Sequence, residues 1–234
     1  MTVSGMRGHL ARLVLGILAC SVTFGLSARP DDLRCQNETN VVVHSLDYSD
    51  AQTACAGAAD AIRFLHALGL VTTGQVDLRV VDELPGSRIS SRSGCFIASE
   101  RCAYLLTFAK LQERGTPFDL PIDRALYQSM AAHEVAHVIA ANNFVVPAPR
   151  IEAQEYIAYV TMLGTMAPSY RDLLLAQYPG GGFVTETEIN TTVYLFDPLR
   201  FGIQAYRHFL KAENGKAFVQ RVLAGQALVA GDDN

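Results

Sequence analysis

Residues 131–140 read AAHEVAHVIA, and the predicted fold and function are built outward from this stretch. Small and apolar residues surround His133, Glu134 and His137, which together form an HExxH motif. On a helix, residues i and i+4 lie one turn apart on the same face, so both imidazoles can reach one ion. In such an apolar helix Glu134 would otherwise be a buried charge without a partner. The stretch therefore predicts a metal centre on a buried helix, the alternative being two ordinary helix histidines.

The residue types of the motif favour zinc chemistry. Neutral imidazole suits Zn²⁺, and two nitrogen ligands leave room for a third protein ligand and a water molecule. The metal would lower the pKa of that water toward ~7. Glu134 would take the proton of the water as it attacks a carbonyl, and could later pass it to the leaving amine.

A third ligand is expected on the next predicted helix, residues 151–166. Two acids lie there one turn apart, Glu152 and Glu155, and Glu155 lies 18 positions after His137. The alternative for either acid is a place on a solvated helix face. The residue types alone leave the choice between them open.

This arrangement resembles the gluzincin branch of the metallopeptidases, in which HExxH is followed by a glutamate ligand on the next long helix. Residues 154–158 read QEYIA, similar to the Asn-Glu-Gly-Phe-Ala stretch of that family, and this match favours Glu155 as the ligand. The resemblance covers roughly residues 101–225. It implies a zincin-like fold, a Zn²⁺ cofactor and a peptide or protein substrate. It also implies that the hairpin over residues 95–108 is an edge strand beside the zinc, to which a peptide adds as an extra strand.

Two positions depart from the family pattern. Phe201 stands where the family often has a tyrosine that stabilises the tetrahedral oxyanion. Tyr194, Tyr206 and His208 are the nearby candidates for that catalytic donor, although each could instead serve packing. Tyr159 stands where thermolysin-like members have an aspartate that orients a histidine, so no residue is assigned to that task.

Composition and charge exclude several other classes of protein. The chain has 234 residues, half of them hydrophobic, and a net charge of −4. This composition excludes a disordered or fibrous chain, and the length suits one domain. No basic stripe interleaved with aromatic residues is present, which argues against a nucleic-acid partner. No sequence feature indicates the oligomeric state.

The first 28 residues have the layout of a secretory signal peptide. Arg7 and Arg12 precede an apolar run over residues 13–26, and Ser27-Ala28 follow before a polar stretch. The apolar run is short of the ~20 residues that a membrane span needs, and no later stretch reads as a span. We expect a secreted or periplasmic protein, cleaved near Ala28, with a single domain over residues 29–234. An uncleaved anchor helix and a lipoprotein acylated at Cys20 are the alternatives.

Four cysteines remain after the predicted leader. An even number in an exported protein indicates two disulfides, and four cysteines allow three pairings. Because local pairs are favoured, we expect Cys35–Cys55 and Cys95–Cys102. The alternative is that the cysteines are buried thiols.

Hydrophobic periodicity and turn residues predict an α+β fold, with a β-containing N-terminal half and a helical C-terminal half. Strands are expected over residues 39–44, 76–81, 95–97 and 102–108. Helices are expected over residues 49–68, 121–141, 151–166, 198–211 and 216–223. Two functions are compatible with this fold: a zinc metallopeptidase, or a catalytically inactive zinc-binding envelope or interaction module. An open coordination position in a cleft would favour the first, and a site sealed by side chains the second.

Overall fold

The computed structural model describes residues 31–86, 93–115 and 120–229, together with Met1. The predicted leader, including Cys20 and the cleavage point near Ala28, lies outside these residues apart from Met1. Among the described residues, no helix is both long enough and apolar enough to cross a membrane.

A five-stranded mixed sheet forms the N-terminal half, with the order β1-β2-β3-β5-β4. Its strands are β1 (Asp31–Arg34), β2 (Val41–Ser45), β3 (Val76–Val81), β4 (Gly94–Ile97) and β5 (Cys102–Leu106). The three central strands β2, β3 and β5 are parallel, and each edge strand pairs antiparallel to its neighbour. Every residue of β5 is buried, as a continuous apolar run in a central parallel strand predicts. Among the described residues, the sheet ends in β4, which lies next to the fully buried β5.

Two long helices, α1 (Tyr48–Ala67) and α3 (Arg124–Ala141), pack against the sheet and against each other. The Asp123 side chain accepts a hydrogen bond from the backbone N–H of Leu126 and caps α3. For this reason α3 begins three residues later than the expected helix over residues 121–141. The two helices touch at Gly57, where a Cβ would lie 2.3 Å from the carbonyl oxygen of Gln128. This close approach fixes α3 against α1, which itself packs against the sheet.

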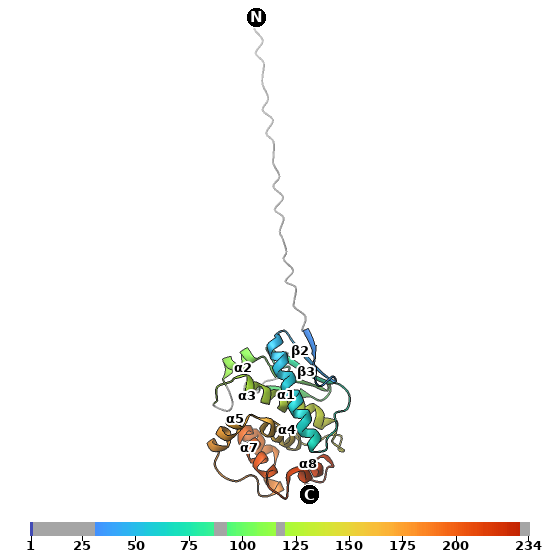
Figure 1. Ribbon diagram of the computed structural model, residues 1–234, viewed down its shortest axis with the longest axis vertical. Coiled ribbons are helices and arrows are strands. Elements are labelled where there is room, and N and C mark those ends of the chain that lie inside the picture. The colour runs from blue at the N-terminus through green and yellow to red at the C-terminus, as the bar shows by residue number, and fades with distance from the viewer. Residues whose placement is uncertain (2–30, 87–92, 116–119, 230–234) are drawn as a thin grey trace.

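The rest of the chain is helical, and in Figure 1 α4, α5, α7 and α8 lie together on the side away from the sheet. The elements after the sheet, besides α3, are α2 (Phe108–Arg114), α4 (Ile151–Thr165), α5 (Pro168–Gln177), η1 (Glu186–Glu188), α6 (Thr191–Phe196), α7 (Pro198–Phe209) and α8 (Gly215–Leu223). One buried hydrophobic cluster includes residues of the sheet and of these helices. The expected α+β order is confirmed, whereas β1, α2, α5 and α6 are elements that the sequence patterns did not indicate.

One of the two expected disulfides is present. Cys35 and Cys55 are bonded and link the segment before β2 to α1, which confirms that pair. The pair Cys95–Cys102 is wrong, because both residues are thiols. In the β4–β5 register Cys95 lies opposite Tyr104, so Cys102 is its diagonal neighbour. Diagonal positions are roughly 7–8 Å apart, beyond the separation that suits a disulfide. Burial, above all, raises the pKa of the Cys102 thiol to about 11.

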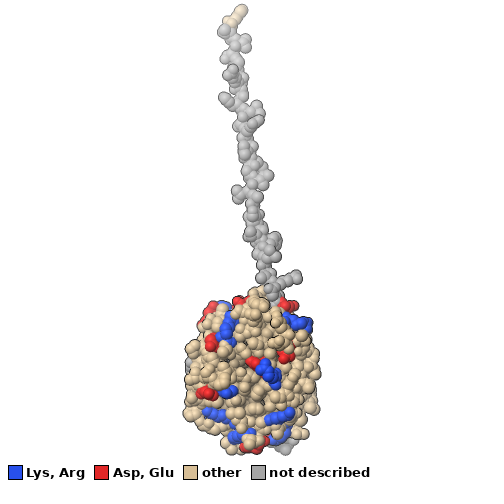
Figure 2. Space-filling model, in the orientation of Figure 1, with Lys and Arg blue, Asp and Glu red and all other residues tan. Residues whose placement is uncertain are grey.

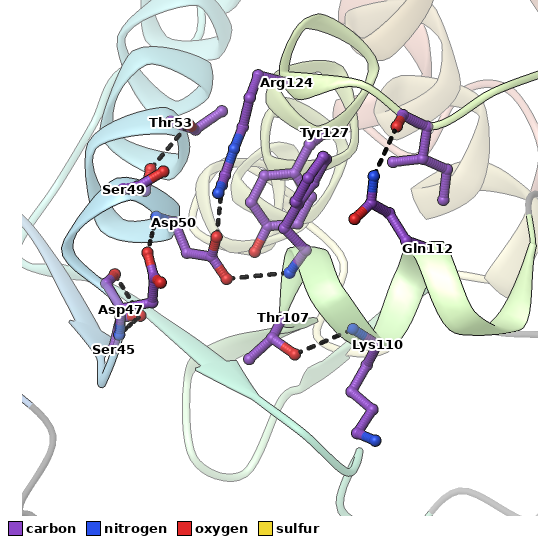
Figure 3. Close-up of polar contacts among 12 residues, drawn as sticks. Ser45, Asp47, Ser49, Asp50, Thr53, Thr107, Lys110, Gln112, Arg124 and Tyr127 are labelled. Carbon is purple, nitrogen blue, oxygen red and sulfur yellow. Dashed lines mark hydrogen bonds and ion pairs between the residues drawn. The ribbon is translucent and has the colours of Figure 1, made fainter.

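A buried carboxylate joins the beginnings of three helices, as Figure 3 shows. Asp50 in the first turn of α1 is 3% exposed and pairs with the guanidinium of Arg124 at the start of α3. Its second oxygen accepts the backbone N–H of Phe108, the first residue of α2, at 2.9 Å. The Arg124 guanidinium also lies 4.0 Å from the centre of the Phe108 ring. Asp50 thus fixes the N-terminal end of α3, the helix that carries the HExxH motif.

On the face drawn in Figure 2, Lys and Arg residues are interspersed with Asp and Glu residues among uncharged ones.

Candidate metal centre

The HExxH residues lie in the middle of α3, on the turn that packs toward α4 and β4. The Nε2 atoms of His133 and His137 are 3.2 Å apart, and the two ring centres are 4.9 Å apart. This is the one-turn spacing that the i, i+4 pattern predicts. The two imidazoles therefore present their nitrogens to the same point.

Helix α4 brings Glu155 to the same point. Its Oε2 lies 3.5 Å from Nε2 of His133, and its Oε1 lies 3.8 Å from Nε2 of His137. One ligand atom from each of the three residues falls within 4.8 Å of the other two. The structure thus gathers the three predicted ligands into one cluster.

The donor set and its spacing fit zinc. A tetrahedral Zn²⁺ site with bonds of ~2.1 Å has edges of roughly 3.4 Å. The 3.2 Å between the two Nε2 atoms and the 3.5 Å from Nε2 of His133 to Oε2 of Glu155 are close to that edge, whereas the 3.8 Å contact with His137 is made by the other oxygen, Oε1. Two imidazole nitrogens and one carboxylate oxygen also form a ligand set found in catalytic zinc sites.

The other candidate ligand, Glu152, is committed elsewhere. Its side chain is 2% exposed, and Oε1 lies 2.6 Å from Nε of Arg150. Its Oε2 accepts the hydroxyl of Thr191. Glu155 therefore points toward the histidines, whereas Glu152 is held by its contacts with Arg150 and Thr191.

The electrostatics of the cluster keep Glu155 ionised. Burial by itself would raise the pKa of Glu155, but the charge of His137, the contacts with His133 and the hydroxyl of Tyr194 lower it to about 2. Burial would lower the pKa of His133, and the carboxylates of Glu155 and Glu134 outweigh it and raise that pKa. Glu155 is therefore a carboxylate at neutral pH, the form that binds a metal.

Edge strand β4 passes over the carboxylate of Glu134. A Cβ at Gly94 would lie 2.4 Å from Oε1 and 2.5 Å from Cδ of Glu134, so only a glycine leaves room there. Two residues further along β4, the Phe96 ring stacks on His137 at a centre-to-centre distance of 6.3 Å. The family resemblance implies an edge strand beside the zinc, but no sequence pattern indicates these two contacts, because both depend on how β4 lies against α3.

The three candidate oxyanion donors lie in different places. The hydroxyl of Tyr194 donates to Oε1 of Glu155 at 2.9 Å, which puts this residue at the cluster. His208 Nδ1 shares a hydrogen bond with the hydroxyl of Tyr156 at 2.8 Å, and Tyr206 stacks on Phe209. The contacts described for His208 and Tyr206 therefore lie in the packing of α4, α7 and α8.

The two departures from the family pattern are found beside the cluster. The Tyr159 ring meets His133 edge-on, with centres 4.7 Å apart. Phe201 at the start of α7 packs edge-on against both Tyr159 and Tyr194. Close packing extends to Gly202, where a Cβ would lie 2.2 Å from the Tyr159 ring. Tyr159, Tyr194 and Phe201 thus form a group of packed aromatic rings beside the ligands, next to α7.

Fold and site together define an α+β protein with a His-His-Glu cluster at the edge of a mixed sheet. The chain belongs to a family of unknown function, DUF6639, whose model matches residues 41–232. That segment includes every element from β2 to α8 and all the cluster residues. None of the curated proteins and none of the solved structures matches the chain.

Proposed function

We propose that this protein is a secreted or periplasmic zinc metallopeptidase of the gluzincin type, with a zincin-like fold. The observation that carries the proposal is the meeting of His133, His137 and Glu155, each of which offers one ligand atom within 4.8 Å of the other two. The two histidine Nε2 atoms are 3.2 Å apart, near the edge of a tetrahedral zinc site. When bound, a zinc ion would supply the Lewis acidity that makes water a nucleophile at neutral pH. A helix with an i, i+4 histidine pair, a glutamate between them and an acid from the next helix supports this assignment.

Glu134 is the general base of the proposed reaction. It follows His133 directly on α3, and its side chain lies under Gly94 of β4. Its carboxylate takes a proton from the attacking water and returns it to the leaving amine.

Edge strand β4 is the proposed binding place for the peptide. Among the described strands β4 pairs with β5 alone, so the backbone groups of its outer edge can pair with an extended chain. The contacts of Gly94 with Glu134 and of Phe96 with His137 put such a chain next to the cluster. A peptide or protein substrate fits this arrangement.

The Cys35–Cys55 disulfide supports the proposed compartment, because structural disulfides form and persist mainly in oxidising environments. The leader layout over residues 1–28 supports it independently.

Metal content and its removal test the proposal. We expect one zinc per chain in the purified protein, loss of hydrolysis of a mixed peptide library on chelation, and recovery when zinc is added back. His133→Ala should lose zinc and activity. His66→Ala should keep both, because His66 is an exposed residue that shares a hydrogen bond with Thr72. A wild-type protein that binds no zinc would sink the proposal.

The burial of the cluster favours a second function, an inactive zinc-binding module of the same fold. The side chains of His133, His137 and Glu155 are only 13%, 8% and 14% exposed. A zinc ion held there without turnover would stabilise the packing of α3 on α4. Zinc in the wild-type protein, with no hydrolysis of any library peptide, would favour this module over the peptidase.

The Gly94–Glu134 contact gives a further prediction. Gly94→Ala would place a methyl group in the space of the Glu134 carboxylate and against the carbonyl oxygen of Tyr104. Since a displacement of about 1 Å can cost ~100-fold in rate, we expect about that loss of peptide hydrolysis with zinc content unchanged. Gly181→Ala is the matched control, because no atom lies within 4 Å of its added Cβ. Full hydrolysis by Gly94→Ala would show that Glu134 does not need its present position.

A further inference from the structure

Helix α6 contacts α4 through two hydroxyl–carboxylate hydrogen bonds, one turn apart. Thr191 donates to Oε2 of Glu152, and Tyr194 donates to Oε1 of Glu155 at 2.9 Å. The two donors are three residues apart on α6, and the two acceptors are three residues apart on α4. One turn of α6 therefore lies along one turn of α4 and reaches the cluster at its second contact.

The position of α6 is itself fixed by its cap. The side chain of Asn190 accepts the backbone N–H of Val193 at 3.0 Å and donates to the carbonyl oxygen of Thr187 at 2.9 Å. Tyr194 is 8% exposed, and its ring packs edge-on against Phe201, with centres 5.6 Å apart. The cap fixes α6 and Phe201 packs on the ring, so the hydroxyl stays directed at Glu155.

The hydrogen bond divides the two oxygens of Glu155 between two tasks. Oε1 accepts from Tyr194 and is the oxygen nearer His137, while Oε2 is the oxygen 3.5 Å from Nε2 of His133. A carboxylate held at one oxygen cannot rotate freely, so Oε2 stays directed toward His133. Partners of this kind commonly orient a ligand and tune its affinity for the metal.

We propose that Tyr194 is a positioning residue for the metal ligand Glu155, and that α6 braces the metal centre through it. This inference rests on the proposed function for the presence of the metal. It assigns the hydroxyl of Tyr194 to a ligand rather than to a reaction intermediate, because that hydroxyl has one hydrogen and Glu155 receives it.

Zinc affinity tests the inference directly. Tyr194→Phe keeps the ring that packs on Phe201 and removes only the hydroxyl. We expect zinc to bind 10–100-fold more weakly by competition with a chromophoric chelator. The melting temperature of the chelator-treated protein should change little. The visible spectrum of the Co²⁺-substituted protein should shift, because it reports the geometry of the ligands.

Matched variants separate positioning from general packing. Tyr48→Phe removes the hydroxyl of an exposed tyrosine at the start of α1 and should leave zinc affinity and the cobalt spectrum unchanged. Tyr194→His restores a ring N–H donor and should recover part of the affinity, and it serves equally if the phenylalanine variant fails to fold. Thr191→Val removes the other contact and should weaken zinc binding less than Tyr194→Phe.

The outcomes distinguish this inference from the proposed function. Wild-type zinc affinity and an unchanged cobalt spectrum in Tyr194→Phe would overturn the role of Tyr194 while leaving the zinc centre in place. A wild-type protein without affinity for zinc would overturn the proposed function and this inference together. Weaker binding in Tyr194→Phe, partly recovered in Tyr194→His, is the result that the structure leads us to expect.

Discussion

Replacing Glu134 with glutamine is expected to lower the rate of peptide hydrolysis by about 10²–10⁴-fold, the usual contribution of a general acid–base group. Glutamine has nearly the shape of glutamate, so it fits under Gly94, but its amide cannot take a proton from water. The residue is not one of the three predicted ligands, so the variant should bind one zinc per chain. The turnover rate on a cleaved library peptide and the zinc content measure the two effects separately.

The control for Glu134→Gln is Glu213→Gln, which makes the same chemical change at an exposed position after α7. We expect wild-type turnover from the control. Unchanged turnover in Glu134→Gln would remove Glu134 from the reaction while leaving the zinc assignment standing. Loss of zinc from the variant would instead show that Glu134 helps to hold the metal, contrary to the proposed roles.

The residues of the candidate centre that lie on one helix could be predicted because their geometry is local. His133 and His137 need only a helix to share a face, and the apolar residues around them predict that helix and its burial. Glu155 needed more, because residue types did not separate it from Glu152. Only the family resemblance favoured it, and the structure places it beside the histidines through the packing of α4 on α3.

Contacts that depend on tertiary packing could not be predicted from the sequence. The approach of Gly94 to Glu134 joins positions 40 residues apart, and the bond from Tyr194 to Glu155 joins positions 39 residues apart. Gly94 has no local feature that separates it from an ordinary turn glycine. Helix α6 has six residues, too few for a clear hydrophobic period, so Tyr194 could be named as a candidate but not given its partner.

The wrong cysteine pair has the same cause. Closeness in the sequence correctly favoured Cys35–Cys55, where α1 returns past the segment before β2. For Cys95 and Cys102 the deciding quantity is the register of β4 on β5, which is set by the turn between them and by which side chains face α3. Phe96 packs on His137 of the cluster, and this contact fixes which face β4 turns toward α3. The positions of Cys95 and Cys102 follow from that orientation.

Replacing Arg124 with glutamine is expected to destabilise the folded protein by about 3 kcal/mol, the lower end of the range for removing one partner of a buried ion pair. The cost arises because the Asp50 side chain is 4% exposed, and the backbone N–H of Phe108 would remain of the two partners described for its carboxylate. We place the value at the lower end because the Arg124 side chain is 39% exposed, so water already screens the pair. Urea unfolding, with an unchanged slope and a lower midpoint, measures the loss.

The opposite change should cost less, and the difference tests the explanation. Asp50→Asn leaves the Arg124 guanidinium without its ion-pair partner, but water can reach that charge. We therefore expect a loss of about 1 kcal/mol, the net value of one hydrogen bond. The double variant should be more stable than the sum of the single effects predicts, since the buried charge is absent once Asp50 is neutral. Arg200→Gln, an exposed change in the first turn of α7, is the matched control and should fall within ±0.5 kcal/mol of the wild type. If Asp50→Asn cost as much as Arg124→Gln, the stability would come from the cation on Phe108 and the shape of the contact, not from the burial of the carboxylate.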